Sequence, residues 1–241
     1  MMTKRIAAFA ATGFAAFALA ACGDGSAASD GRSQYEVAGD YAKGSPDAPV
    51  TMIEYASVAC GGCAAWHASA MPTVNEYVDS GDVRYVFREM ITGQPQLAFA
   101  GFMLARCAPE EQYFDVVDVL FEQQRALFMA MQQGQAQTQF QQIAGTLGFS
   151  NDEFRACMAN EELLAEVQAS NEAAVAAGVT GTPSFFINGQ FLEPVANPDG
   201  SGQAYGVNGE ALVDDQGAIP ATFEGETFER IILYFKARAE E

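Results

Sequence analysis

Two cysteines in this 241-residue chain have the spacing of a reactive dithiol. The motif Cys60-Gly61-Gly62-Cys63 follows an apolar run and precedes a helical pattern, so it is expected at a strand-to-helix turn. The start of a helix favours negative charge, because its unpaired N–H groups and its dipole stabilise anions. We therefore expect Cys60 to be the exposed attacking thiolate and Cys63, one turn inward, to resolve the mixed disulfide.

The same Cys-x-x-Cys spacing is also half of a zinc site. The sequence has no second motif of this kind, and His67 is its only histidine, so no metal is expected here. One alternative to a redox dithiol is a site that binds copper or zinc, in a protein that would also be a lipoprotein. Another is a purely structural disulfide. Gly61 and Gly62 disfavour the structural disulfide, since they leave the backbone open towards the sulfur. His67 and Trp66 are expected to be packing residues.

Glu54 stands in the otherwise apolar stretch Val50–Tyr55, six residues before Cys60. This stretch reads as a buried strand, which would place Glu54 beneath the dithiol turn. A buried carboxylate could relay a proton to or from Cys63. Strand alternation also allows Glu54 to face water, so both interpretations stay open.

The elements around the dithiol form a predicted β-α-β unit. The strand over residues 50–55 leads into a helix that runs to about Val78, with Pro72 expected to kink it near 68–71. Residues 83–88 alternate as a second strand. The two strands should be parallel, because a helix connects them.

A helical block is expected next, over residues 95–178. Ser150 and Glu153 predict a capping box within it. Cys107 and Cys157 both fall on its helices and are expected to form a structural disulfide, worth roughly 4 kcal/mol in the chain-entropy model. Two free buried thiols are the alternative. The expected helices are Gln96–Cys107, Glu110–Met131, Thr138–Leu147, Asn151–Met158 and Glu161–Ala177.

Strand patterns return after residue 182. Pro183–Ile187 and Gln190–Leu192 flank Asn188-Gly189, which is a strong hairpin signal. Residues 194–222 are expected to form a loop or a small hairpin, because they are rich in Gly, Pro, Asn and Asp. The last helix is expected over 227–239, with apolar side chains on one face.

These features together resemble the DsbA-like thioredoxin-fold family of bacterial envelope oxidoreductases. The resemblance is carried by Glu54 in its strand, the Cys60-Gly61-Gly62-Cys63 turn, the helical insertion and Gly181-Thr182-Pro183. It covers roughly residues 40–192 and the last helix. The implied fold is α/β, with a central mixed sheet flanked by helices and an inserted helical domain.

The resemblance also implies site residues and an activity. In this family the proline matching Pro183 is cis and faces the dithiol, and the residue matching Thr182 holds a substrate strand by β-pairing. A carboxylate at the position of Glu54 is a family feature as well. The implied function is thiol–disulfide exchange on reduced envelope or secreted proteins, with no cofactor and with a separate redox partner for recycling.

The residues between the cysteines depart from the family pattern. Strong oxidases of the family usually carry Pro-His there, whereas this chain has Gly61-Gly62. Without that imidazole, Cys60 should be less acidic and the protein a milder oxidant. Reductase or isomerase activity is therefore an alternative. Residues 194–222 have no obvious counterpart in the family.

The N-terminal residues predict secretion. Lys4 and Arg5 precede the apolar run 6–21, which is typical of a signal peptide and short for a membrane span. Leu19-Ala20-Ala21-Cys22 resembles a bacterial lipobox, so lipidation of Cys22 is expected; a plain signal peptide is the alternative. The small polar residues that follow predict a tether over 22–40, so the chain would attach to a membrane only through lipid, in the bacterial envelope.

The formal charge of −19 excludes some classes of partner. A surface this acidic argues against nucleic acid and against adhesion to anionic lipid. The expected organisation is a signal peptide (1–21), a tether (22–40), the first half of a thioredoxin fold (41–94), the helical insertion (95–178) and the second half (179–241).

Overall fold

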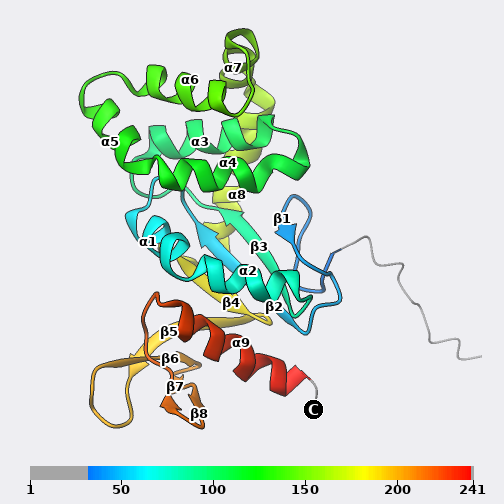
Figure 1. The fold of residues 1–241 in the computed structure, drawn as a ribbon, viewed down its shortest axis with the longest axis vertical. Helices are drawn as coiled ribbons and strands as arrows, with labels where there is room; N and C mark the ends of the chain where they lie inside the picture. The colour runs from blue at the N-terminus through cyan, green and yellow to red at the C-terminus, as the bar shows by residue number, and fades with distance from the viewer. Residues whose placement is uncertain (1–31, 240–241) are drawn as a thin grey trace, which may run out of the picture. The chain divides into compact units, whose positions relative to one another are not determined.

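The computed structural model of this protein describes residues 32–239. The expected signal peptide, the expected lipidation site Cys22 and most of the expected tether lie outside the described residues. One seven-stranded mixed sheet forms the frame, in the order β1-β3-β2-β4-β5-β6-β7 (Figure 1). Its strands are β1 Tyr41–Lys43, β2 Val50–Ala56, β3 Val83–Glu89, β4 Ser184–Ile187, β5 Gln190–Ala196, β6 Gln203–Val207 and β7 Glu210–Ala211.

Strand β2 lies at the centre of this sheet, and all of its residues are buried. It runs parallel to β3 and antiparallel to β4, which confirms the predicted β-α-β unit. Burial on both faces explains why its sequence is continuously apolar apart from Thr51 and Glu54. A separate two-stranded sheet pairs β8 Val213–Asp214 with β9 Gly217–Ala218.

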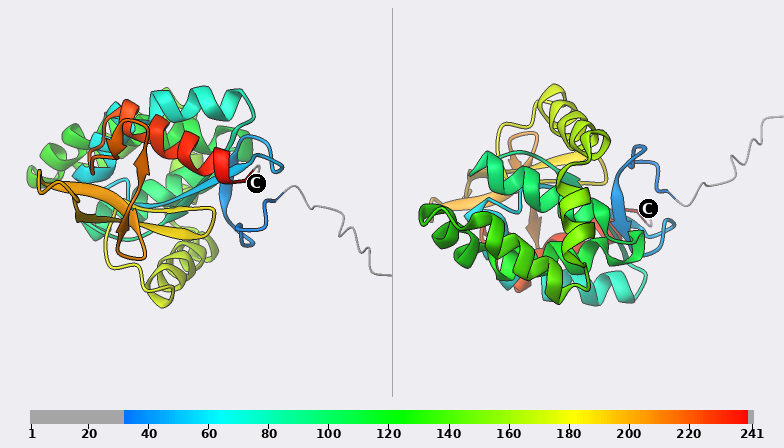
Figure 2. Two further views of the ribbon diagram at one scale, coloured as in Figure 1. Left: turned by 90° about the horizontal axis from the view of Figure 1, so that it is seen from below. Right: turned by 90° about the horizontal axis from the view of Figure 1, so that it is seen from above.

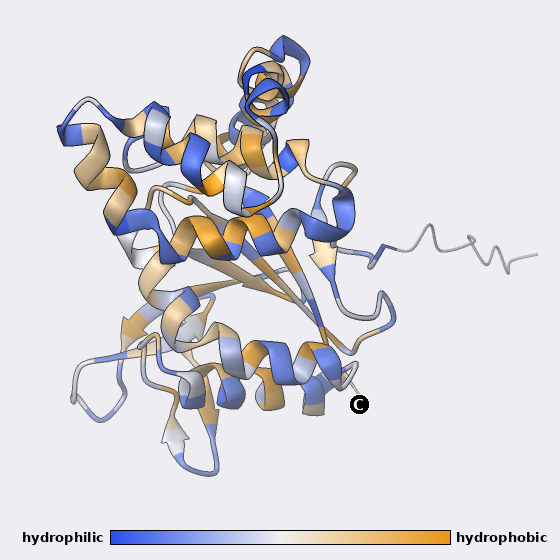
Figure 3. Cartoon of the chain, turned by 45° about the horizontal axis from the view of Figure 1, so that its top comes forward, coloured by the Kyte–Doolittle hydropathy of each residue, from blue (hydrophilic) through white to orange (hydrophobic). Residues whose placement is uncertain are grey.

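Helices cover both faces of the sheet and one of its ends. Helices α1, α2 and α9 lie on one face and α8 on the other, while α3 to α7 stack beyond one end (Figures 1 and 2). Hydrophobic and hydrophilic stretches alternate along them, as expected for helices with one buried side (Figure 3). Their bounds are α1 Gly61–Ser69, α2 Met71–Asp79, α3 Pro95–Cys107, α4 Tyr113–Glu122, α5 Gln124–Gln132, α6 Ala136–Thr146, α7 Asn151–Met158, α8 Glu161–Ala176 and α9 Gly225–Ala239.

Two of the predicted helices are divided in the structure. The helix after the dithiol breaks at Ala70, inside the predicted kink, and Pro72 stands in the first turn of α2. The single helix predicted over Glu110–Met131 is wrong: a short 3₁₀ turn precedes α4, and the chain turns at Gln123 before α5. This break brings the Gln124 side chain onto the dithiol turn, and neither Pro nor Gly marks it in the sequence.

The helical block contains the expected local features. A disulfide joins Cys107, at the end of α3, to Cys157 in α7, so these thiols are not free. The capping box of Ser150 and Glu153 starts α7.

The prediction that residues 194–222 form a loop or a small hairpin is wrong, because it underestimates how much strand structure the segment contains. Strand β5 continues into this segment, and β6 and β7 add two more strands to the central sheet. Glycine allows a close approach here, since a Cβ on Gly206 would lie 2.7 Å from the Val195 side chain. Asn208 and Gly209 form the connecting turn with positive φ angles, which these residue types tolerate.

The described end of the expected tether, residues 32–40, contacts the domain instead of extending from it. Glu36 pairs with Arg84 at 2.9 Å, and Asp40 pairs with Arg88 at 2.8 Å. Both arginines belong to β3, far along the chain, so local composition gave no sign of these contacts.

The turn after β3 yields a test of the frame around the dithiol. Gly93 has φ +71°, and a Cβ there would lie 2.0 Å from the Ala59 carbonyl oxygen. Gly134 has nearly the same φ, +70°, with open space around it. Gly134→Ala should cost about 1 kcal/mol of unfolding free energy, and Gly93→Ala at least about 2 kcal/mol more, because backbone must also move. Urea unfolding measures both, and equal losses would contradict the close approach.

Candidate active site

Three neighbouring strand ends bring the site together. Strands β2 and β3 are parallel, so both of their C-terminal ends reach the same edge of the sheet. Strand β4 is antiparallel to β2, so its N-terminal end lies at that edge too. The dithiol follows β2, Thr92 follows β3, and the Thr182-Pro183 segment precedes β4. Segments separated by many positions along the chain therefore converge on one point.

The dithiol occupies the start of α1, as predicted. Cys60 is the residue before the first helical turn, with extended backbone angles, and its carbonyl accepts the first helical hydrogen bond, from Ala64. Its sulfur is half-buried, whereas Cys63 is completely buried in the first turn. A reagent can therefore reach Cys60 before Cys63.

The Thr182-Pro183 segment packs directly against the dithiol. The peptide bond between these residues is cis. In its thiol form Cys60 donates a hydrogen bond from Sγ to the Thr182 carbonyl oxygen, at 3.2 Å. A Cβ on Gly62 would lie 3.2 Å from Pro183 Cδ and 3.7 Å from Cys60 Sγ, so glycine here permits the close approach of the proline.

The two sulfurs differ in their affinity for a proton. The pKa of Cys60 is lowered to about 5, first by the hydrogen bond from the Cys63 thiol, against the opposing effect of burial. The Thr182 hydroxyl and the N–H groups of Cys63 and Gly62 lower it further. Burial, the hydrogen bond to Cys60 and the charge of Glu54 raise the pKa of Cys63. The helix start thus contributes as expected, but the neighbouring thiol contributes more.

Glu54 lies in the interior, so the interpretation that it faces water is wrong. Its side chain is 0% exposed. Oxygen Oε2 accepts a hydrogen bond from the Tyr85 hydroxyl and lies 2.9 Å from His67 Nε2. Oxygen Oε1 has no hydrogen-bond partner in the described part of the chain. The charge of Glu54 also raises the pKa of Cys63, after the larger effects of burial and of the hydrogen bond to Cys60. The carboxylate is therefore within electrostatic reach of the inner thiol.

His67 belongs to the site, which the sequence analysis missed. Its ring does pack, stacked on Phe121 with centroids 4.1 Å apart, but Nε2 also contacts Glu54. Its Nδ1 lies 3.8 Å from Asp118, whose carboxylate is 48% exposed. The four-residue spacing from Cys63 puts both side chains on one helix face, and this was the available signal. The contact with Glu54 comes from another element and left no local sign.

Two further polar residues contact the site, although no sequence motif indicates them. The buried Gln124 side chain donates from Nε2 to the carbonyls of Val58 and Cys60, at 2.9 and 3.0 Å. The Thr92 hydroxyl lies 2.5 Å from the Thr182 hydroxyl. Both residues fix the surroundings of Cys60 from outside the dithiol turn.

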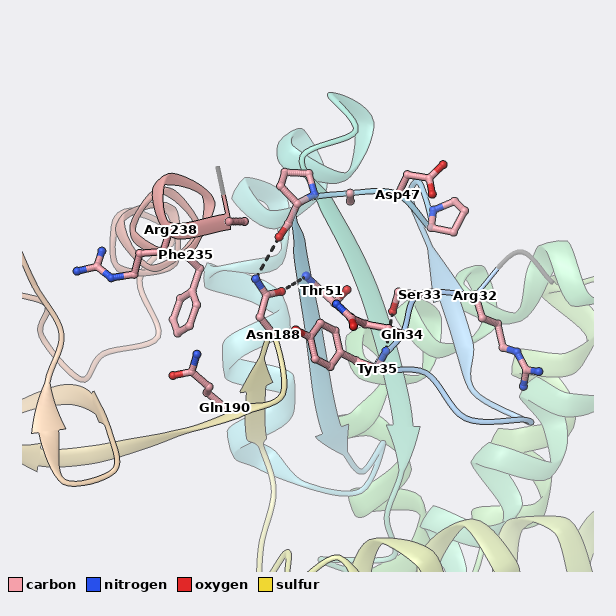
Figure 4. A pocket seen from close by; sticks show the side chains of 14 residues that line it. Arg32, Ser33, Gln34, Tyr35, Asp47, Thr51, Asn188, Gln190, Phe235 and Arg238 are labelled. Carbon is pink, nitrogen blue, oxygen red and sulfur yellow. Dashed lines mark hydrogen bonds between the residues drawn. The ribbon is translucent and has the colours of Figure 1, made fainter. Parts of the chain in front are cut away.

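Other features of the described chain lie away from this chemistry. Within residues 32–239, no group of three or more His, Cys, Asp or Glu side chains is arranged to hold a metal ion. The same range contains no helix with the length and apolarity to cross a membrane. The pocket in Figure 4 lies at the opposite end of β2 from the dithiol, where Asn188 bonds to the backbone of Thr51 and Pro49.

The lowered pKa of Cys60 predicts how stability depends on pH. Folding moves the pKa of Cys60 from the ordinary thiol value of 9.0 to about 5. The thiolate therefore stabilises the reduced protein fully above pH 9 and stops doing so as the pH falls through about 5. The reduced protein should lose unfolding free energy relative to Cys60→Ser over this window, while Cys63 is common to both. Urea unfolding between pH 4 and 9 measures the difference, and a constant difference would contradict the shift.

Comparison with known proteins agrees with the geometry of the site. A family model described as Thioredoxin (Thioredoxin_4) matches residues 36–203, which include the dithiol turn and Thr182-Pro183. A Rickettsia bellii protein provisionally named a protein-disulfide oxidoreductase is 28% identical over 62% of this chain and 57% of its own length. A similarly named protein from Rickettsia conorii is 31% identical over 62% of this chain and 53% of its own length. The chain thus spans little more than half the length of these curated relatives.

The fold resembles that of a solved disulfide-exchange protein. The crystal structure of Wolbachia pipientis α-DsbA1 matches with a TM-score of 0.65 and 23% identity, over 85% of this chain and 94% of that one. At this identity the likeness shows the fold alone. The family model covers well over half of the sequence. The chain therefore belongs to the thioredoxin family that this model describes, Thioredoxin_4.

Proposed function

We propose that this protein is a thiol:disulfide oxidoreductase whose redox centre is the Cys60–Cys63 pair. One observation carries the proposal: an accessible sulfur with a pKa of about 5 lies beside a buried thiol whose pKa is raised. This asymmetry separates an attacking sulfur from a resolving one. The names of the Rickettsia relatives support the same activity.

The proposed oxidation transfers two electrons from a substrate dithiol to the protein. A substrate thiolate attacks Sγ of Cys60, the Cys60–Cys63 bond breaks, and Cys63 leaves and takes up a proton. The second substrate thiolate then attacks the substrate's own sulfur in the mixed disulfide. The substrate disulfide forms, and Cys60 departs as a thiolate. Because the surroundings stabilise that thiolate, release of Cys60 is favoured and net oxidation is the favoured direction.

The Thr182-Pro183 segment would hold the substrate during this exchange. Strand β4 begins only at Ser184, so the backbone of Thr182 lies beyond the strand ladder, beside the half-buried Cys60 sulfur. An extended substrate segment could pair with this backbone and bring its cysteine to Cys60.

Glu54 would move the proton that Cys63 gains and loses. Its carboxylate is buried beneath the dithiol, and Oε1 is free to exchange a proton while Oε2 is held by Tyr85 and His67. A thiol with a raised pKa reacts slowly unless a base accepts its proton. Glu54 therefore has the role of proton relay, with His67 orienting it.

We further propose that the protein acts in the bacterial envelope, attached through lipid on Cys22. The basic start, the apolar run and Leu19-Ala20-Ala21-Cys22 support this placement. Reduced envelope proteins would then be the substrates, and another redox protein would reoxidise the dithiol. The mass of the mature N-terminus is the decisive measurement: a free, unmodified Cys22 would rule out the anchor.

The activity is tested with oxidised full-length protein and reduced, denatured ribonuclease A. With glutathione disulfide present to reoxidise the dithiol, we expect catalytic formation of substrate disulfides by the natural sequence and none by Cys60→Ser. The reduced Cys63→Ser variant should accumulate a mixed disulfide with scrambled, disulfide-containing ribonuclease A. The Cys60 thiolate attacks a substrate disulfide, one substrate sulfur leaves as a thiol, and the thiol that would displace the substrate from Cys60 is missing. Gels run without reductant, with and without later reduction, show the adduct. An adduct through Cys63, or turnover by Cys60→Ser, would contradict the assigned roles.

The relay is tested with Glu54→Gln, which keeps the shape and removes the charge. During reoxidation by glutathione disulfide, Cys63 displaces glutathione from Cys60, and we expect this step to slow about 10-fold or more, in line with the usual effect of losing an acid–base group. Alkylation of Cys60 should change little, because Glu54 is not among the causes that set its pKa. Stopped-flow measurement of both steps decides the matter, and unchanged resolution would remove Glu54 from the mechanism.

A further inference from the structure

A second threonine stands one step behind the sulfur of Cys60. Thr92 follows β3, and its hydroxyl lies 2.5 Å from the hydroxyl of Thr182. Thr182 itself lies against Cys60: Cys60 Sγ is 3.2 Å from the Thr182 carbonyl oxygen, and the Thr182 side chain is one of the groups that lower the pKa of Cys60. Thr92, Thr182 and Cys60 therefore follow one another in a row, and of the three only Cys60 would react with substrate.

The position of Thr92 is fixed from three sides. Its carbonyl accepts a hydrogen bond from the Ser57 hydroxyl at 3.1 Å. The preceding Ile91 donates its N–H to the Asn171 side chain at 2.8 Å, and the following Gly93 touches the Ala59 carbonyl. The Thr92 hydroxyl is therefore presented to Thr182 by a turn with little freedom to move.

A hydroxyl has one proton to donate, so it matters which of the two threonine hydroxyls donates to the other. If Thr182 donates to Thr92, no hydroxyl proton points at Cys60. If Thr92 donates to Thr182, the Thr182 proton points at the sulfur, and the two hydrogen bonds strengthen each other. A thiolate at Cys60 selects the second arrangement.

We propose that Thr92 is a positioning residue, which orients the Thr182 hydroxyl towards Cys60 and so favours the reduced, thiolate form. The inference rests on the proposed function of Cys60 and adds a residue from the turn after β3 to the control of its charge. Thr92 does not itself touch the sulfur, so its whole effect on Cys60 passes through Thr182.

The test is the pH profile of Cys60 alkylation by iodoacetamide in the reduced full-length protein. Among the described residues, Cys63 is the titratable group recorded in contact with Cys60, and every variant keeps it. Thr92→Val retains the shape and removes the donor, so the profile should move to higher pH and the rate at pH 5 should fall about threefold. Thr92→Ser should restore the natural profile.

Two controls isolate the route through Thr182. In a Thr182→Val background, Thr92→Val should have no further effect, because the hydroxyl it orients is gone. Thr222→Val removes a matched donor from a distant threonine pair, Thr222 and Thr227 at 2.7 Å, and should leave the profile unchanged. Additive effects of the two variants, or an unchanged profile in Thr92→Val, would overturn the assignment. A natural profile centred near pH 8.5 would instead overturn the proposed function itself, and this inference with it.

Discussion

A negative charge on the sulfur of Cys60 is what the rest of the site depends on. It is stabilised by the Cys63 thiol, by N–H groups at the start of α1 and by the Thr182 hydroxyl. The disulfide form carries no such charge, so these donors favour the reduced protein over the oxidised one. In the proposed reaction, stronger donors would make the protein accept electrons from a substrate more readily. Charge stabilisation at a single atom would thereby favour net oxidation of the substrate.

The sheet supplies these donors through its topology. Because β2 and β3 are parallel and β4 runs the other way, one edge of the sheet receives Cys60, Thr92 and Thr182 together. The helical block closes the same edge through Gln124, which holds the carbonyls of the dithiol turn. Beneath the turn, Glu54 and His67 form a buried hydrogen-bonded pair. The fold thus places the groups that stabilise charge above the dithiol and the proposed proton relay below it.

Local patterns in the sequence were enough to predict the dithiol turn, the β-α-β unit, a kink where α1 and α2 separate, and the capping box that starts α7. Each depends on residues close together in the chain. The contacts that were missed join distant segments: Thr92 to Thr182, His67 to Glu54, and Glu36 to Arg84. The turn at Gln123 was missed because polar helix-forming residues surround it, and because Gln124 bonds to carbonyls sixty-odd positions away along the chain. Residue types and spacing could not show these partners.

The most direct test of the charge on Cys60 is the reduction potential of the Cys60–Cys63 pair. It can be read from the fluorescence of Trp66, the only tryptophan, in glutathione buffers of known ratio. Thioredoxin, with a pKa near 7, has a potential of about −270 mV. A pKa of about 5 for Cys60 corresponds to a potential roughly 60 mV higher, near −210 mV. A value at or below about −270 mV would show that the thiolate is not stabilised.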